Sequence, residues 1–566
     1  MALPLMDSLS APVRAHLTSL PRLHRRPDSG LRPPEGRSVT YGERVNPRRL
    51  APRPSRLVRI ASIVACATLA VGTVAPLTAS SAASGGPPPT EVRADDFPAD
   101  LSAFYTQQLA WEACKDGMSC AWMNVPLDYA DPSGPTIRLR VAKVKATGDP
   151  AARQGSLVIN PGGPGGSAID FTSYVAQSIT PKVNEQFDIV GFDPRGVDHS
   201  TPIVCLTGRQ TTALIRQDGT PDTAAEERQL MTIAKMIPRG CLTKSPTLAR
   251  HVGTENTVKD MDVLRAVLGD SKLNWLGFSY GTYMGTLYAE AFPDRVGRFV
   301  LDGPVNPANG PVAMSLGQSR AFQVAVTRFA ADCAKRSTCA YKGGTKSVLA
   351  GINRLLARLD LQEMPAKKGR TLTQSEALTA VFTSMYTTQL WPWLRSGLKQ
   401  ATKNDGSQLL ALADYANERT GPDTYANNMA SAFYAIGCWD APAPPGAAGL
   451  RTLAARWSAN APVPEMAQSM AWGMAPCAQW FGHTTRVPAP AASTTTAPIL
   501  VVGTIYDPAT PYPWALALSS QLTTSTLLTY RGDGHTAFGS GSACIDKAID
   551  TYILTGQQPP KGTVCT

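Results

Sequence analysis

The strongest constraint on the fold of this chain is the segment Gly277–Gly281, with the sequence GFSYG. The apolar run 273–276 precedes it and the amphipathic segment 283–292 follows it, which predicts a strand, a sharp turn and a helix. Glycines two residues before and after Ser279 let strand and helix pass closely, because they have no side chain. The hydroxyl would stand above a sheet, at a helix N-terminus where negative charge is stabilised. A chance turn can share this pattern, so a catalytic role depends on the rest of the chain.

Apolar runs and helical patterns alternate on both sides of Ser279. Strands are expected at 122–127, 137–144, 156–160, 187–192, 273–276, 296–301, 499–504 and 526–530, and helices at 169–176, 257–268, 283–292, 514–522 and 543–554. Strands that alternate with helices at this pace form a mostly parallel sheet with helices on both faces. We therefore predict an α/β fold, in which functional side chains lie at the carboxyl ends of the strands.

The alternation stops between residues 311 and 493, where the pattern is helical, rich in aromatic residues and broken by Pro and Gly. We expect this segment to be a helical cap inserted over the strand ends. The α/β core would then be built from residues 101–310 and 494–566. A linker at 84–100 and a leader at 1–83 would precede it.

The net charge of +11 is concentrated in the leader. Residues 1–59 hold twelve arginines and four acidic residues, so they carry eight of the excess positive charges. The rest of the chain has no concentrated basic run, which argues against nucleic acid as a partner. The uncharged, apolar segment 60–83 ends in small residues, as secretory signal peptides do. The alternatives are an uncleaved membrane anchor, since the segment is about long enough to span a membrane, and lipidation of Cys66. We expect the segment to be cleaved and the mature protein to be secreted without stable membrane association, either free or bound to the cell wall.

Ten cysteines follow the leader, and an even number in an exported chain indicates disulfides. Sequence alone leaves the connectivity open, and pairing of nearest neighbours gives 114–120, 205–241, 333–339, 438–477 and 544–565. Metal ligation is the alternative, but the chain lacks Cys-x-x-Cys pairs and His partners at zinc spacing. We therefore expect disulfides and no metal.

Two further residues complete a possible catalytic triad with Ser279. Asp507 and His535 each follow a predicted strand, and the chain order Ser, Asp, His is that of one known class of hydrolase. Serine needs a base to become nucleophilic, histidine supplies it, and the carboxylate orients the imidazole. Asp302, which also follows a predicted strand, is the main alternative acid, and Asp533 beside the histidine is another.

Three other histidines lie after the leader, but their positions are less favourable. His199 lies in a polar loop after a strand-end turn, and His251 and His483 have no strand before them. Asp193 begins that turn, before a proline, and is expected to be structural.

The segment 160–167, with the sequence NPGGPGGS, is the candidate oxyanion hole. Its glycines and prolines follow an apolar run and predict a fixed turn with exposed N–H groups at a helix start. We expect the amides of Gly163 and Tyr280 to stabilise the oxyanion. A phosphate-binding loop is the alternative, but no Gly-Lys-Ser/Thr follows, and no cofactor is implied.

The chain resembles the secreted tripeptidyl aminopeptidases, which are relatives of proline iminopeptidase within the α/β-hydrolases. The resemblance includes the C-terminal region of that family, and it is carried by the segments 161–167, 193–196, 277–281, 506–511 and 534–536. The resemblance implies a cap, acidic residues on or near it that hold the substrate's free amine, and removal of short N-terminal units. Asp440 and Glu465 are candidates for that carboxylate, with a solvated side chain as the alternative for each. Where this chain has Asp198, relatives usually carry glycine, which leaves the substrate preference open.

These observations predict a secreted, monomeric serine exopeptidase that hydrolyses peptide bonds near a free N-terminus through an acyl-enzyme. An esterase or amidase that acts on small acyl compounds with the same triad is the alternative. A non-catalytic binding protein is a third interpretation, but such proteins tend to lose a triad residue or the oxyanion glycines, and none is missing from this sequence.

Overall fold

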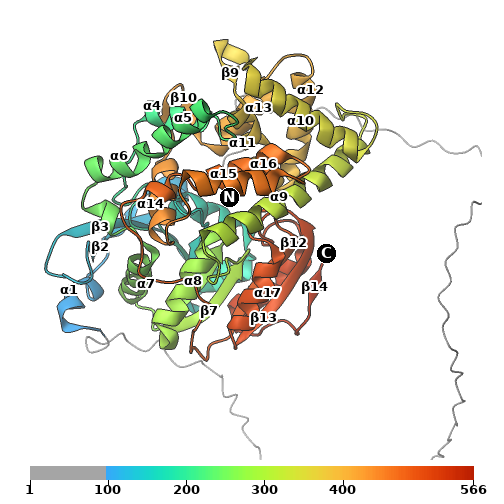
Figure 1. Ribbon diagram of the computed structural model, residues 1–566. Coiled ribbons are helices and arrows are strands. Elements are labelled where there is room, and N and C mark those ends of the chain that lie inside the picture. The colour runs from blue at the N-terminus through green and yellow to red at the C-terminus, as the bar shows by residue number, and fades with distance from the viewer. Residues whose placement is uncertain (1–96) are drawn as a thin grey trace, which may run out of the picture. The chain divides into compact units, whose positions relative to one another are not determined.

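A ten-stranded sheet forms the centre of the computed structural model, which describes residues 97–566 (Figure 1). The strand order is β1-β2-β3-β5-β4-β6-β7-β12-β13-β14. The pairs from β1 to β5 are antiparallel, and all pairs from β5 to β14 are parallel. The strands are β1 Glu112–Ala113, β2 Ser119–Pro126, β3 Thr136–Val144, β4 Gly155–Asn160, β5 Phe187–Phe192, β6 Leu273–Phe278, β7 Val296–Asp302, β12 Ile499–Tyr506, β13 Ser525–Asp533 and β14 Val564–Cys565.

The central strands bury side chains on both faces, which explains their continuous apolar sequence. In β4, Leu157 and Ile159 join the hydrophobic core on one face, and Val158 joins the core on the other. The helices that pack on the Val158 face are α7 Thr254–Val267, α8 Tyr280–Ala291 and α17 Tyr512–Gln521. Those on the opposite face are α2 Ala168–Ser178, α3 Pro181–Gln186 and α18 Ala543–Thr555. The predicted α/β fold is therefore confirmed.

Helices inserted between β7 and β12 form a cap, in the upper part of Figure 1, and most of them pack around a hydrophobic core separate from those of the sheet, whereas the helix Met429–Trp439 packs into the core on the Val158 face. Phe329, Leu356 and Leu398 are among the buried side chains of the separate core. The cap helices are α9 Pro311–Ala334, α10 Thr345–Leu361, α11 Gln374–Met385, α12 Trp391–Ala401, α13 Ser407–Ala416, α14 Met429–Trp439, α15 Ala447–Ser458 and α16 Pro464–Trp472. The cap also holds two small sheets that the sequence pattern does not predict, β8 Met364–Pro365 with β9 Thr371–Leu372, and β10 Arg419–Gly421 with β11 Thr424–Tyr425.

Three helices between β5 and β6 pack beside the cap, and the sequence analysis does not predict them. They are α4 Gly208–Arg216, α5 Ala224–Ala234 and α6 Met236–Lys244, and a short α1 Ser102–Tyr105 lies near the start of the described residues. Helix α4 contacts α11, and α6 contacts α14. Thr207 and Thr223 each form a capping box with a Gln or Glu three residues later, and this local signal could have located α4 and α5.

The cysteines pair as nearest neighbours, Cys114–Cys120, Cys205–Cys241, Cys333–Cys339, Cys438–Cys477 and Cys544–Cys565. The predicted pairing is confirmed. Within residues 97–566, we find no helix with the length and apolar character needed to cross a membrane. The predicted leader, the signal peptide and Cys66 lie outside the described residues.

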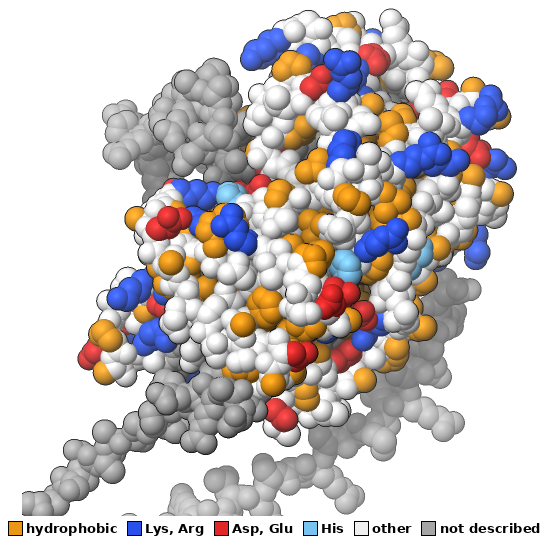
Figure 2. Space-filling view, turned by 90° about the vertical axis from the view of Figure 1, so that its left-hand side faces the viewer, with side chains coloured by type: hydrophobic (Ala, Val, Ile, Leu, Met, Phe, Trp, Pro, Cys, Tyr) orange, Lys and Arg blue, Asp and Glu red, His pale blue; other side chains and the backbone are white. Residues whose placement is uncertain are grey.

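Charged side chains on the face shown in Figure 2 are scattered, with Lys and Arg interspersed among Asp, Glu and hydrophobic side chains. By contrast, Arg195 and Asp260 form an ion pair that is fully buried. Arg195 Nε and Nη2 each donate to an oxygen of Asp260 at 2.7 Å. The guanidinium also donates to the carbonyl groups of Leu127 at 2.8 Å and Pro126 and His251 at 3.0 Å. These bonds join the turn after β5 to α7 and to the end of β2.

Replacing Arg195 with Met should lower the free energy of unfolding by about 3–5 kcal/mol, because Asp260 would remain buried without its partner. Adding Asp260→Asn should recover part of this loss, since the unpaired charge is then removed. Urea unfolding followed by circular dichroism measures both effects. Arg336→Ala is the control, because it removes an exposed ion pair with Asp332 and should lower the free energy of unfolding far less. Equal losses for Arg195→Met and the control would contradict this account of the buried pair.

Candidate active site

Ser279 stands at the apex of a strained turn between β6 and α8. Its φ of 54° and ψ of −123° lie where non-glycine residues are seldom found. A Cβ atom on Gly277 would lie 2.5 Å from the Gly281 carbonyl oxygen, and one on Gly281 would lie 2.8 Å from the Asn160 carbonyl oxygen. Both positions therefore need glycine, which is the physical reason for the spacing that the sequence shows.

The structure brings the predicted acid and base together. Asp507 follows β12, His535 follows β13, and these strands are adjacent in the sheet. Nδ1 of His535 lies 2.9 Å from both carboxylate oxygens of Asp507. Strand β7 alone separates β12 from β6, the strand that ends before Ser279. The three predicted residues therefore lie at the same edge of the sheet.

Further donors fix the Asp507 carboxylate in place. One oxygen accepts from the amides of Ala509 at 2.9 Å and Thr510 at 2.8 Å, and the other from the Thr510 hydroxyl at 3.0 Å and the Thr536 amide at 3.1 Å. These bonds orient the carboxylate toward the imidazole, whose tautomer it can then set. Thr510 is a supporting residue that the sequence analysis misses.

The structure does not join Ser279 to His535 by a hydrogen bond. Among residues 97–566, the Ser279 hydroxyl has no hydrogen-bond partner. The two side chains line different cavities, which share Phe433 as a wall. Hydrogen bonds of catalytic groups are often long before substrate binds and tighten afterwards, so the geometry remains compatible with a triad.

Asp302, the main alternative acid, binds a different part of the site. It is fully buried at the end of β7, and its carboxylate accepts from the amides of Ala537 at 3.0 Å and Phe538 at 2.8 Å. Its carbonyl oxygen accepts from the Ser279 amide at 2.9 Å. Burial raises the pKa of Asp302 to about 6. This carboxylate therefore holds the loop after His535 through backbone amides, whereas that of Asp507 contacts the ring.

Asp533, the other alternative acid, is paired with the cap. Arg328 of α9 donates Nε and Nη2 to its two carboxylate oxygens, with the Nη2 bond at 2.8 Å. The Arg328 guanidinium also lies over the ring of Tyr506, 3.5 Å from its centroid. Asp533 thus has a cation as its partner instead of the imidazole.

Asp193 and His199 form a polar cluster near the start of α2. Buried Asp193 accepts from the hydroxyl of Ser167 at 2.9 Å and lies 3.0 Å from Nδ1 of His199, as expected for a structural role. Hydrogen bonds with Asp193 and Asp198 raise the pKa of His199 to about 10. Ligand atoms of Asp170, Asp198 and His199 lie within 4.8 Å of one another, but these groups already pair among themselves, and we assign no metal to them.

The predicted oxyanion loop lies directly against the serine turn. A Cβ atom on Gly162 would be 2.5 Å from the Phe278 carbonyl oxygen and 2.9 Å from the Tyr280 amide nitrogen. Gly162 and Gly163 have φ of 90° and 117°, which glycine adopts without strain. Gly163 and Tyr280 line the same cavity as Ser279. The close approach of this loop thus accounts for its glycines.

The cavity beside Ser279 has a volume of about 380 Å³ and lies between the core and the cap. Tyr283, Val305 and Met314 are among its apolar walls. The predicted Asp440 lines it as well, but its carboxylate already accepts from the Thr254 amide at 2.7 Å and the Tyr280 hydroxyl at 2.8 Å. Burial raises the pKa of Asp440 to about 6.

Glu465, the second predicted amine-binding carboxylate, does not line the cavity of Ser279. It lies in the first turn of α16, where burial raises its pKa. Its charge interacts with that of Asp360 on α10, within the cap. The structure therefore gives no geometric support to Glu465 as a site residue.

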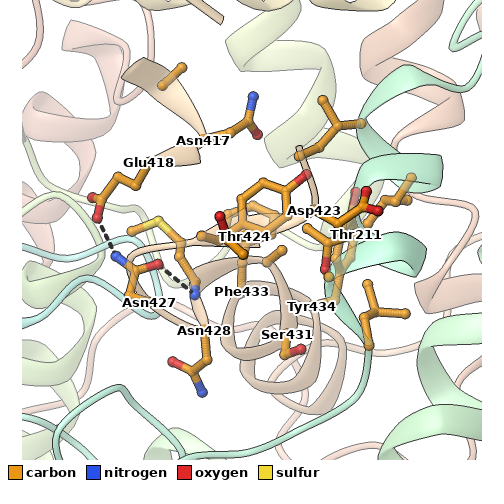
Figure 3. Close-up of a pocket in the computed structure, with 18 of the residues that line it drawn as sticks. Thr211, Asn417, Glu418, Asp423, Thr424, Asn427, Asn428, Ser431, Phe433 and Tyr434 are labelled. Carbon is orange, nitrogen blue, oxygen red and sulfur yellow. Dashed lines mark hydrogen bonds between the residues drawn. The ribbon is translucent and has the colours of Figure 1, made fainter. Parts of the chain in front are cut away.

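Glu418 is a carboxylate that the sequence analysis misses. It lines two cavities of about 590 and 780 Å³, of which the first is drawn in Figure 3 and the second contains His535. Its side chain accepts a hydrogen bond from Asn427 (Figure 3). Burial and the charges of Asp170 and Asp198 raise the pKa of Glu418, and no Lys or Arg among residues 97–566 is paired with it.

Comparison with known proteins places the chain in a family. Residues 461–565 match the model of the TAP-like protein family. The chain is 36% identical over 480 residues to the serine protease Hip1 of Mycobacterium tuberculosis, covering 81% of this chain and 91% of the relative. It is also 36% identical over 477 residues to carboxylesterase B of the same organism, covering 81% and 90%. It is 32% identical over 473 residues to a tripeptidyl aminopeptidase of Streptomyces lividans, covering 80% and 86%.

These alignments span most of this chain and of each relative, and the sheet and serine turn have the arrangement expected for the fold. The chain therefore belongs to the α/β-hydrolase family that includes the tripeptidyl aminopeptidases and the serine protease Hip1.

Proposed function

We propose that the protein is a serine exopeptidase that removes short units from peptides with a free N-terminus. The observation that carries the proposal is the Asp507–His535 pair at the same sheet edge as Ser279 on its strained turn. The names of two relatives, a serine protease and a tripeptidyl aminopeptidase, support a peptide as the substrate.

In the proposed reaction, the Ser279 oxygen attacks the scissile carbonyl carbon while Nε2 of His535 takes the hydroxyl proton. The amides of Gly163 and Tyr280 donate to the oxyanion of the tetrahedral intermediate. Asp507 stabilises the imidazolium, which then gives its proton to the leaving amine. Water, activated by the same imidazole, hydrolyses the acyl-enzyme and restores the serine.

We assign recognition of the substrate amine to Glu418. Glu418 lines the cavity that contains His535, its carboxylate lacks a Lys or Arg partner among the described residues, and its backbone φ is 51°. A substrate ammonium would supply the missing positive charge, and strained residues of this kind are often found at binding sites. Asp440 is the weaker candidate, because Thr254 and Tyr280 already hold its carboxylate.

An esterase acting on small acyl compounds is the second candidate. One relative with the same 36% identity is named carboxylesterase B, and the cavity beside Ser279 has apolar walls that would suit a small acyl group. The triad chemistry is the same in both cases, so the substrate's amine decides between them.

We also propose that the chain is exported and acts as a monomer outside the cytosol, with residues 311–493 as its cap. The five disulfides support a location outside the reducing cytosol. Peptides with a free N-terminus would be its partners there.

Replacing Ser279 with Ala should lower kcat by about 10⁵-fold or more, because the nucleophile is lost. Folding should be retained, which thermal unfolding of the same sample checks. Hydrolysis of a tripeptide p-nitroanilide measures the loss, and labelling by a fluorophosphonate should disappear with it. Undiminished turnover in this variant would rule out Ser279 as the nucleophile.

Asp507→Asn and Asp302→Asn separate the two candidate acids. The first should lower kcat by about 10⁴-fold, because an amide sets the wrong imidazole tautomer. The second should lower kcat by less than about 10²-fold, because it only loosens the loop after His535. Both variants have nearly unchanged volume, which makes them a matched pair. A larger loss for Asp302→Asn would reverse our assignment of the acid.

Glu418→Gln should raise KM for a tripeptide anilide with a free amine by about 10- to 100-fold, since a charge-assisted hydrogen bond is lost. The same variant should hydrolyse p-nitrophenyl acetate at the parental rate. Asp423→Asn is the matched control, because Asp423 is an exposed carboxylate that lines the other cavity of Glu418 and not the one that contains His535, and KM should not change.

Blocking the substrate amine by acetylation should reproduce the effect of Glu418→Gln in the parent enzyme. If the parent instead cleaves blocked and free peptides equally well, recognition of a free amine is excluded and the exopeptidase proposal fails. If it hydrolyses p-nitrophenyl esters and neither peptide, the esterase candidate replaces the exopeptidase. If Asp440→Asn alone raises KM, the amine site belongs to that residue.

A further inference from the structure

Arg328 of the cap contacts one residue just before the proposed acid and one residue two positions before the proposed base. Asp533, its partner in the two-pronged ion pair, lies two residues before His535. Tyr506, whose ring lies under the guanidinium at 3.5 Å, directly precedes Asp507. One side chain from α9 therefore bridges the ends of β12 and β13, where the Asp507–His535 pair is formed.

Tyr386, at the end of α11, contacts His535 itself. Its carbonyl oxygen accepts from the His535 amide at 2.8 Å. Its ring meets the imidazole edge to face, with centroids 5.3 Å apart and planes at 89°. A Cβ atom on Gly534 would lie 2.9 Å from the same carbonyl oxygen, so the two segments approach as closely as glycine allows.

We propose that Arg328 and Tyr386 are positioning residues, through which the docked cap keeps His535 in reach of Ser279. The proposal rests on the proposed function only in requiring that Ser279 and His535 act together as nucleophile and base. Reaction rates depend steeply on the distance between reacting groups, and a displacement of about 1 Å can cost 10²-fold. Within the described residues, Ser279 and His535 share no hydrogen bond that would fix their separation. The position of His535 therefore depends on its contacts with Tyr386 and on the ion pair of Arg328.

The test compares Arg328→Gln, Asp533→Asn and the double variant in the full mature chain. Each single substitution should lower kcat about tenfold with KM unchanged, because the base is misplaced while the binding cavity is kept. The double variant should be no worse than the singles, since all three lack the same contact. A p-nitrophenyl ester and a tripeptide anilide should show the same loss.

Arg395→Gln is the matched control. It removes another cap ion pair, with Asp332 at 2.8 Å, and should lower the melting temperature without lowering kcat. Tyr386→Leu removes the ring contact and should slow labelling of Ser279 by a fluorophosphonate, because that reaction needs the base.

Parental kcat in both Arg328→Gln and Asp533→Asn would make the ion pair merely structural and overturn the proposal. Losses that multiply in the double variant would overturn it as well. If Arg328→Gln fails to fold, the nearly isosteric Asp533→Asn decides the outcome. Failure of the exopeptidase assignment is recognised separately, because the ester would then be hydrolysed while the tripeptide anilide would not.

Discussion

The buried residue Asp302 links the two halves of the proposed triad. Its carbonyl oxygen accepts from the Ser279 amide, and its carboxylate accepts from two amides in the loop after His535. A buried carboxylate is costly unless hydrogen bonds compensate it, which is consistent with a pKa raised to about 6. The hydrogen bonds to Asp302 therefore hold the loop after His535 at the end of β7. Through this residue, the strained serine turn and the histidine loop share one anchor.

Three residues with strained backbone conformations line the cavities of Ser279 and His535. Of the seven non-glycine residues with positive φ among residues 97–566, four are Asp198 at 30°, Ser279 at 54°, Glu418 at 51° and Thr536 at 68°, and the other three lie elsewhere. Ser279 lines one cavity, and Glu418 and Thr536 line the cavity of His535. The φ of Asp198 is one that glycine would adopt without cost. Strain of this kind persists only where surrounding contacts hold it, as the hydrogen bonds to Asp302 and Asp507 do here.

Sequence patterns predict the parts of the molecule that local chemistry determines. The strands follow from continuous apolar runs, and the serine turn follows from two glycines whose side chains would collide with nearby backbone. Glu418 and Arg328 are not predictable in this way, because their importance depends on residues far away in the chain. Arg328 and Asp533 are 205 positions apart, and only the folded cap brings them together. Glu465 is the opposite case, because the family resemblance suggests it as a site carboxylate, whereas in the fold it does not line the cavity of Ser279.

The two relatives named serine protease Hip1 and carboxylesterase B share the same 36% identity with this chain. Overall sequence identity therefore does not distinguish a peptide from an ester as the substrate. We expect the residues that line the cavities to determine the substrate preference. The cap forms part of the cavity walls, since it supplies Glu418, Phe433 and Tyr386, and the core forms the rest. The cap also supplies the contacts of Arg328 and Tyr386 beside the Asp507–His535 pair. Since one insertion forms part of the walls and also these contacts, a substitution there is expected to change KM and kcat together unless it is aimed at a single contact.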